Sequence, residues 1–151
     1  MKKTIDVYEH MGEILKGVKS GVLITGKADD KVNSMTISWG MIGIEWGKPI
    51  FVTFIRENRF TRSLIEKTGE FTVSIPIDDS AKKILGFCGS KSGRDIDKAK
   101  EIGLTYEEPE MTSVPGVKEL PLTLECKVVY KQTQDTEAMT EENREKFYPQ
   151  N

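Results

Sequence analysis

One segment of the chain concentrates residue types that can bind a phosphate group. It runs from Cys88 to Lys98 and reads Cys-Gly-Ser-Lys-Ser-Gly-Arg-Asp-Ile-Asp-Lys. Glycines let a backbone approach a ligand closely, hydroxyls donate hydrogen bonds, and lysine and arginine neutralise an anion. A polar loop with solvated charges is the alternative interpretation. The candidate contact residues are Cys88, Gly89, Ser90, Lys91, Ser92 and Lys98.

Two common phosphate-binding motifs do not fit this segment. A Walker A loop has glycine directly before its Lys-Ser/Thr pair, and Ser90 stands at that position. The glycine-rich fingerprint of dinucleotide-binding sheets follows a strand, whereas Cys88 follows a helical pattern. We therefore expect a phosphate here to belong to another kind of fold.

Two further polar clusters follow or interrupt apolar segments. The first spans Asn33–Trp39, and the second spans Arg56–Thr61 and leads into a helical pattern. Backbone N–H groups and the positive dipole end of a helix start attract anions, although surface solvation also explains the arginines. Trp39 can flank a flat ligand or fill the core, and the core is favoured for a large aromatic side chain. The candidate contact residues are Asn33, Ser34, Met35, Thr36, Ser38, Arg56, Asn58, Arg59 and Thr61.

Periodicity predicts the elements that position the first two clusters. A helix is expected over residues 8–18, ending near Gly21, and a β-hairpin over 21–25 and 32–39 with Asp29-Asp30 between its strands. Residues 49–55 are apolar on both faces, which predicts a buried central strand. A helix over 60–67 with Gly69 as its C-cap is followed by a strand over 70–75.

The second half of the chain is less regular. Asp78-Asp79-Ser80 predicts the start of a helix through residue 87, and Asp95 that of a short helix closed by Gly103. Residues 104–119 are expected to be irregular, with at most a short strand near Leu104. A strand over 122–130 precedes a polar tail with one helical turn around 141–146. Strands without regular βαβ alternation favour an antiparallel barrel with helical insertions.

Composition limits the possible partners and cofactors. A chain of 151 residues with an evenly spread net charge of −2 predicts one domain, no nucleic-acid partner and no membrane association. Two distant cysteines and the single His10 make a zinc site improbable, and we expect reduced thiols in a cytoplasmic protein. The N-terminus has no apolar leader pattern.

Four motifs occur together in a fixed order between residues 16 and 130. They are Asn33-x-Met35-Thr36-x-Ser38-Trp39, Thr61 at a helix start, Gly69-Glu70-Phe71-Thr72-Val73-x-Ile75-Pro76, and Ser92-Gly93-Arg94-Asp95-x-Asp97-Lys98. In this order the chain resembles the flavin reductase-like family, the FMN-binding split barrels that include NAD(P)H:flavin oxidoreductases and flavoredoxin. The resemblance implies a mainly β, antiparallel Greek-key split barrel with short helical insertions, as one domain over residues 1–151.

The resemblance also implies FMN as the cofactor, held by the candidate residues of the three clusters. Residues 33–38 would line the ring edge, and Arg56–Thr61 together with Ser90, Ser92 and Lys98 would contact the phosphate and ribityl groups. The implied activity carries hydride from NAD(P)H through FMN to free flavin or another acceptor. A flavoredoxin-like carrier that exchanges electrons with protein partners is the alternative, and a split barrel without flavin is a third. Hydride transfer between stacked rings needs no acid or base, so His10 has no catalytic role.

Several expectations remain attached to this resemblance. A homodimer with flavin sites beside its interface is implied. The family's barrel commonly ends in a C-terminal strand with a Gly-Glu pair, which is missing after Pro149. Arg94 is expected to contact phosphate or to pair with Asp95 or Asp97. Cys88 is either a redox thiol or, as favoured here, a small buried residue.

Overall fold

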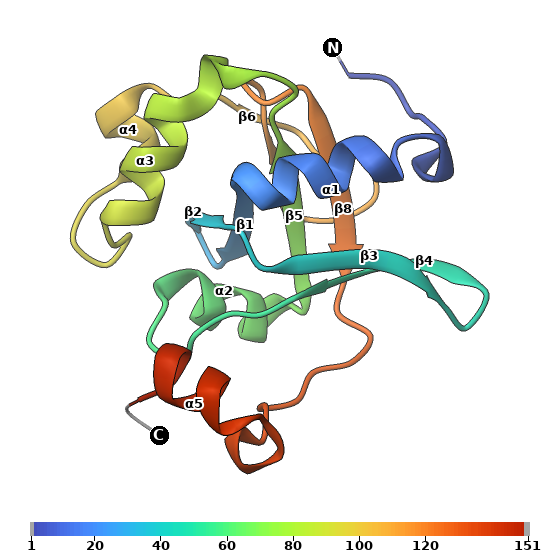
Figure 1. The fold of residues 1–151 in the computed structure, drawn as a ribbon. Coiled ribbons are helices and arrows are strands. Elements are labelled where there is room, and N and C mark those ends of the chain that lie inside the picture. The colour runs from blue at the N-terminus through green and yellow to red at the C-terminus, as the bar shows by residue number, and fades with distance from the viewer. Residues whose placement is uncertain (1, 150–151) are drawn as a thin grey trace.

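The centre of the molecule is a four-stranded antiparallel sheet (Figure 1). The computed structural model describes residues 2–149. The sheet has the order β2-β1-β5-β8. Its strands are β1 (Val22–Ala28), β2 (Lys31–Ile37), β5 (Glu70–Ile75) and β8 (Leu122–Lys127).

The predicted first hairpin is confirmed, although its first strand runs on to Ala28 and its second strand ends at Ile37, two residues before the predicted end. β1 pairs with β2 from Val22 opposite Ile37 to Ala28 opposite Lys31, which leaves a two-residue turn. Asp29 in that turn has φ 57°, a left-handed conformation that Asp tolerates better than most residues. The turn therefore sets the register that presents the polar residues of β2.

A second hairpin extends away from the sheet and corrects one prediction. It consists of β3 (Gly40–Glu45) and β4 (Lys48–Thr53), which pair only with each other within the described residues. The predicted buried central strand over 49–55 is therefore wrong. Phe51 packs against the core while Val52 is exposed, so the apolar run covers the core on one face and meets solvent on the other.

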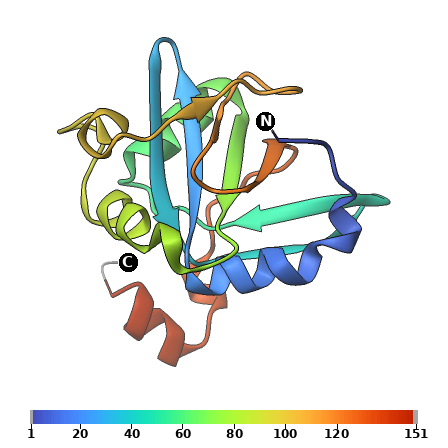
Figure 2. The same ribbon diagram turned by 90° about the horizontal axis from the view of Figure 1, so that it is seen from above.

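The helices α1 and α2 cover the sheet and end close to the predicted residues, whereas α3 (Lys82–Ser90) continues three residues beyond the predicted residue 87. α1 (Met11–Ser20) buries Ile14 and Val18, and α2 (Phe60–Thr68) buries Leu64 and Ile65. Gly69 caps α2 with φ 70°, a conformation that glycine adopts without strain. Figure 2 shows α1 running along one side of the sheet, with α3 beside the β1–β2 hairpin.

The residues predicted to bind a phosphate, Cys88–Lys98, lie on two helices and a loop after β5. A 3₁₀ turn (Asp79–Ala81), capped by Asp78, leads into α3 (Lys82–Ser90). The next helix, α4 (Lys98–Ile102), begins three residues later than the predicted Asp95 because the Asp97 carboxylate accepts a hydrogen bond from the Lys100 N–H at 3.2 Å. Cys88 to Ser90 thus form the last turn of α3, and residues 91–97 form the connecting loop.

The remaining elements are short. β6 (Tyr106–Glu107) and β7 (Gly116–Val117) pair within the segment predicted to be irregular. β8 ends at Lys127, short of the predicted residue 130. The predicted helical turn in the tail is α5 (Glu141–Phe147), which Thr140 caps. Two 3₁₀ turns, Val7–Glu9 and Thr136–Ala138, complete the described structure.

The two faces of the sheet belong to different core clusters. One face contributes Val22, Ile24 and Val73, and the other contributes Leu23, as expected from the alternation of side chains along β1. The thiols Cys88 and Cys126 lie in different clusters and are both free. Among residues 2–149, no helix has the length and apolar character that crossing a bilayer requires.

Candidate functional site

Two adjoining cavities bring together the three polar clusters. We call the larger one, with a volume of about 370 Å³, the loop cavity, and the smaller one, of about 280 Å³, the aromatic cavity. They share Met35, Thr36 and Arg59. The loop cavity is further lined by Asn33, Asn58, Phe60, Thr61, Cys88, Gly89, Ser90, Lys91, Ser92, Gly93, Arg94, Asp95 and Lys98. The aromatic cavity is further lined by Ile37, Ser38, Trp39, Phe54, Ile55, Arg56, Gln134 and Tyr148.

Every candidate contact residue except Ser34 lines one or both cavities. The prediction that the Ser34 hydroxyl faces a ligand is corrected by the structure. Its side chain is fully buried, and its oxygen lies 2.7 Å from the Thr25 hydroxyl and 3.0 Å from the Tyr106 hydroxyl. Burial raises the pKa of Tyr106 to about 12, so this hydroxyl pair stays neutral.

Lys98 is a buried cation at the floor of the loop cavity. Its side chain is 3% exposed, and its ammonium donates to the carbonyls of Ser34 at 3.0 Å and Cys88 at 2.8 Å. Both acceptors are neutral, and no carboxylate within residues 2–149 forms an ion pair with it. Burial lowers the pKa of Lys98 below its ordinary value of 10.5. An anion in the cavity would compensate this charge.

Asn33 connects β2 to the start of α2. Its amide donates to the Thr61 hydroxyl at 2.8 Å, and both residues are buried. The carboxamide lies so close to Gly93 that a Cβ at that position would overlap it. The loop can pass over β2 here only because residue 93 has no side chain.

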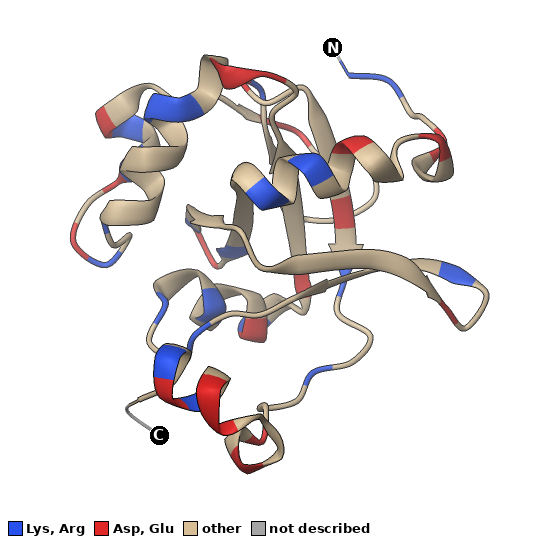
Figure 3. Cartoon of the chain, in the orientation of Figure 1, with Lys and Arg blue, Asp and Glu red and all other residues tan. Residues whose placement is uncertain are grey.

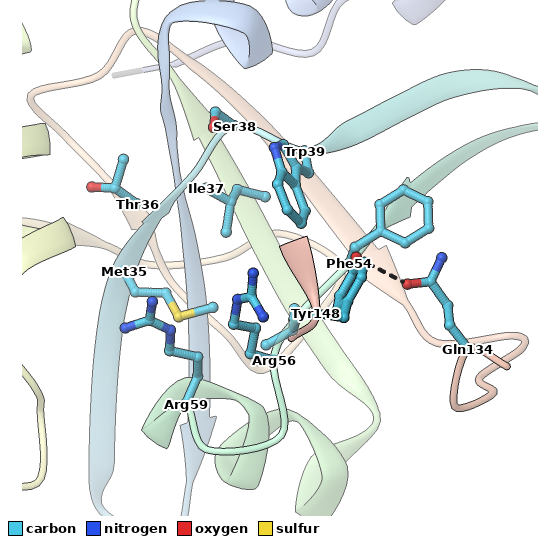
Figure 4. Close-up of a pocket in the computed structure, with 11 residues that line it drawn as sticks. Met35, Thr36, Ile37, Ser38, Trp39, Phe54, Arg56, Arg59, Gln134 and Tyr148 are labelled. Carbon is cyan, nitrogen blue, oxygen red and sulfur yellow. Dashed lines mark hydrogen bonds between the residues drawn. The ribbon is translucent and has the colours of Figure 1, made fainter. Parts of the chain in front are cut away.

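The start of α2 borders both cavities, since Arg59 lines each of them. Arg59 is its N-cap residue, with an extended backbone and no side-chain cap. The first N–H groups of a helix lack intrahelical partners and attract anions together with the helix dipole. Figure 4 shows Arg56 and Arg59 extending from the segment before α2 toward β2.

The serine hydroxyls of the Cys88–Lys98 segment form hydrogen bonds with nearby backbone groups. Ser90 donates to the Phe87 carbonyl at 3.2 Å, and the Ser92 hydroxyl accepts from the Arg94 N–H at 3.2 Å. Arg94 pairs with neither Asp95 nor Asp97. Instead its guanidinium donates to the Asn58 carbonyl at 2.7 Å. Burial raises the pKa of Cys88, which favours the neutral thiol over a reactive thiolate.

Trp39 lies in the wall of the aromatic cavity, so its predicted place in the core is wrong. It is 39% exposed, and its ring centroid lies 5.4 Å from that of Phe147 and 6.3 Å from that of Tyr148. The Arg56 guanidinium lies 5.7 Å from the Trp39 centroid and 5.2 Å from the Tyr148 centroid. Trp39 thus meets both rings edge to face, and the Arg56 guanidinium lies over Trp39 and Tyr148 at the cavity wall.

The tail residues of the aromatic cavity were missed by the sequence analysis. Arg56 donates to the Phe147 carbonyl at 2.9 Å, and the Tyr148 hydroxyl donates to Gln134 at 3.4 Å (Figure 4). The only local signal was the pair Phe147-Tyr148 directly after a short helical pattern in an otherwise polar tail. Nothing in the local pattern could place that pair beside Trp39, which is more than a hundred residues away.

The central sheet is open and antiparallel, and residues of β2, the start of α2 and the loop after α3 line the two cavities beside it. Residues 15–140 match the model of the flavin reductase like domain, and the chain belongs to this family. Membership confirms the predicted family. The likeness to solved flavin reductase-like structures confirms the predicted split-barrel fold.

The chain is also similar to individual proteins in sequence and in structure. The chain is 31% identical over 80% of its length to an uncharacterized protein of Archaeoglobus fulgidus, 66% of which is matched. It is 27% identical to flavoredoxin of Desulfovibrio vulgaris with a TM-score of 0.70, covering 75% of this chain and 61% of that one. It is 18% identical to an FMN-binding domain of a flavin reductase-like enzyme from Shewanella baltica, with a TM-score of 0.69, covering 91% and 68%. The chain thus spans less than two thirds of the matched flavoredoxin.

Proposed function

We propose that this protein binds FMN across the two adjoining cavities and carries electrons from NAD(P)H through it to free flavin or another acceptor. The observation that carries the proposal is the division of the site into one cavity with the buried Lys98 ammonium and another with the Trp39 and Tyr148 rings. FMN has the same division, since a dianionic phosphate and a flat ring stand at opposite ends of a hydroxylated chain. Bound FMN supplies the redox chemistry.

In this arrangement the phosphate end occupies the loop cavity. Lys98 and Arg59 provide positive charge there, and the start of α2 provides backbone donors. The ring occupies the aromatic cavity, where residues 35–38 of β2 and the segment after it lie along its edge and Trp39 lies beside it. The protein's part is to hold the ring in place and exclude water from its inner face.

The decisive test measures FMN binding and reduction separately. Adding FMN to the ligand-free protein should change the visible absorbance of the flavin, and anaerobic NADH or NADPH should then bleach it rapidly. A preparation that never perturbs the flavin spectrum would contradict FMN binding itself. Binding without bleaching, together with reduction by a protein donor, would instead favour the carrier function, which the flavoredoxin structures support.

Arg59 is the sharpest single position for testing the placement of the phosphate. We expect Arg59→Ala to weaken FMN binding by about 1–3 kcal/mol, the size of a lost charge-assisted hydrogen bond, and to leave riboflavin binding unchanged. Arg62→Ala is the matched control because Arg62 lies on the same helix, pairs with Glu66 at 3.1 Å and lines neither cavity. Equal losses of affinity for FMN and riboflavin would contradict a contact between Arg59 and the phosphate.

The proposed assembly is a homodimer in the cytoplasm. Support for a second copy comes from the β3–β4 hairpin, which exposes apolar side chains on a surface where charge is confined to the tip (Figure 3). Met41 and Val52 pair across the hairpin and so lie together on one of its faces, and exposed apolar groups of this kind mark interaction sites. The two free cysteines support a reducing compartment. The exposed apolar residues of the hairpin are Met41, Ile44, Trp46 and Val52.

A further inference from the structure

We propose that Arg94 is a positioning residue that slows release of the phosphate end of the flavin from the loop cavity. It would do so by fastening the loop of residues 91–97 to the start of α2. The inference rests on the proposed function, because it assigns a role to one wall of the same site. The role inferred for Arg94 is to slow ligand dissociation, whereas the role proposed for Arg59 and Lys98 is to neutralise the charge of the phosphate.

Arg94 joins two opposite walls of the loop cavity. Its guanidinium donates to the Asn58 carbonyl at 2.7 Å and lies 5.5 Å from the centroid of the Phe60 ring. Asn58 and Phe60 belong to the segment that opens α2, and Arg94 belongs to the loop that follows α3. All three residues line the cavity, so widening it between these walls breaks both contacts.

Few other contacts hold the loop to α2. Within the loop, the Asp95 and Ile96 N–H groups donate to the Ser92 carbonyl at 3.1 and 3.3 Å, which shapes the loop without attaching it. Gly93 rests on Asn33 of β2. In the part of the chain that the structure describes, the Arg94 guanidinium makes the loop's one side-chain hydrogen bond to the segment that opens α2.

The chemistry of the contact suits a fastening that opens and closes. A planar guanidinium can stack on an aromatic ring and donate in its own plane at once, which an ammonium cannot do. Arg94 is exposed, so both contacts are weak enough to break during ligand release. The Lys31 ammonium, 5.9 Å from the same ring centroid, belongs to β2 and does not connect the loop to α2.

The test compares FMN dissociation rates after rapid dilution, followed by flavin fluorescence. We expect Arg94→Ala to release FMN roughly five- to tenfold faster than the wild type. Arg94→Lys keeps the charge but should retain most of the increase. Phe60→Leu removes only the ring contact and should raise the rate by a smaller factor than Arg94→Ala. The double variant should release FMN no faster than Arg94→Ala alone, because the ring contact that Phe60→Leu removes depends on Arg94. Arg62→Ala, which removes one half-buried positive charge that lines neither cavity, should release FMN at the wild-type rate.

Two results would overturn the inference while FMN binding stands. One is a release rate for Arg94→Ala equal to that of Arg62→Ala. The other is full restoration of the slow rate by Arg94→Lys, which would assign the effect to charge alone.

A second measurement does not depend on FMN. In the ligand-free protein, amide hydrogen exchange over residues 91–97 should be faster in Arg94→Ala than in Arg62→Ala. Unchanged exchange would contradict the fastening even if the protein bound no flavin, so failure of the inference and failure of the proposed function are distinguished.

Discussion

At the residue scale, the loop cavity depends on a close approach that a single methyl group would prevent. Gly93 lies against the Asn33 carboxamide, and that carboxamide in turn donates to the Thr61 hydroxyl. One backbone position in the loop therefore fixes the geometry of a side chain on β2 and of a hydroxyl on α2.

We expect Gly93→Ala to destabilise the fold by about 1–3 kcal/mol, since the added Cβ forces either the loop or Asn33 to move. FMN affinity should fall roughly tenfold with the lost Asn33–Thr61 geometry. Chemical denaturation and a flavin titration measure the two effects. Gly86→Ala is the control because a Cβ added there on α3 would meet nothing within 4 Å beyond its own helix, and it should be neutral or stabilising. A Gly93→Ala protein as stable as Gly86→Ala would contradict the steric argument.

The sequence indicated which residues line the cavities more reliably than it indicated the directions of their side chains. Hydroxyls and cations at a strand and a helix start suffice to nominate a phosphate site, and nearly all of the nominated residues line the cavities. The direction of Ser34 depends on Tyr106 and Thr25, which lie on other strands. The position of Trp39 in the cavity wall depends on its contacts with Phe147 and Tyr148, which belong to the tail. Such partners are tertiary and leave no local signature.

At the element scale, two carboxylates hold the loop between β6 and β7 against the sheet. Glu125 on β8 accepts from the N–H groups of Glu110, Met111 and Thr112, and Glu70 on β5 accepts from the N–H and hydroxyl of Ser113. Partial burial acts to raise the pKa of Glu125, but these N–H donors and the Thr112 hydroxyl outweigh it and hold the pKa below 4.5. The Ser113 donors likewise lower the pKa of Glu70.

This geometry predicts a pH-dependent contribution to stability. A carboxylate with a lowered pKa stabilises the fold above its unfolded value of about 4.5 and loses that contribution as the pH falls through its folded value. Glu125→Gln should therefore be less stable than the wild type at pH 7, and the difference should shrink below pH 4.5. Denaturation curves at several pH values measure it. Glu57→Gln, at an exposed position, should show no such difference, and a gap that stays constant down to pH 3 would contradict the linkage.

Elements with strong periodicity or clear caps were predictable, and those defined by pairing were not. Gly69 and Gly103 ended helices as expected because left-handed caps are encoded locally. β3 has glycines at positions 40 and 43, so it lacks a strand-like pattern and is specified by its partner β4. The place of β4 outside the central sheet follows from that pairing.

At the scale of the whole molecule, the β3–β4 hairpin is the most apolar exposed surface that can meet a second copy. We expect Ile44→Glu, at a position 68% exposed, to shift the protein toward monomer in analytical ultracentrifugation without lowering monomer stability. A buried carboxylate at an interface is costly, while the same group in solvent is not. Met111→Glu is the control, at a position 82% exposed on a different loop. A wild-type protein that sediments as a monomer at all concentrations would contradict the dimer.

The bond between Arg56 and the Phe147 carbonyl has a consequence for the order in which the site matures during synthesis. The loop cavity is lined entirely by residues 33–98, whereas the aromatic cavity also requires Gln134 and Tyr148. Arg56 and Phe147 are 91 positions apart, so closing that contact must wait until nearly fifty more residues have left the ribosome after Lys98. The residues that line the loop cavity are thus all synthesised well before those that complete the aromatic cavity.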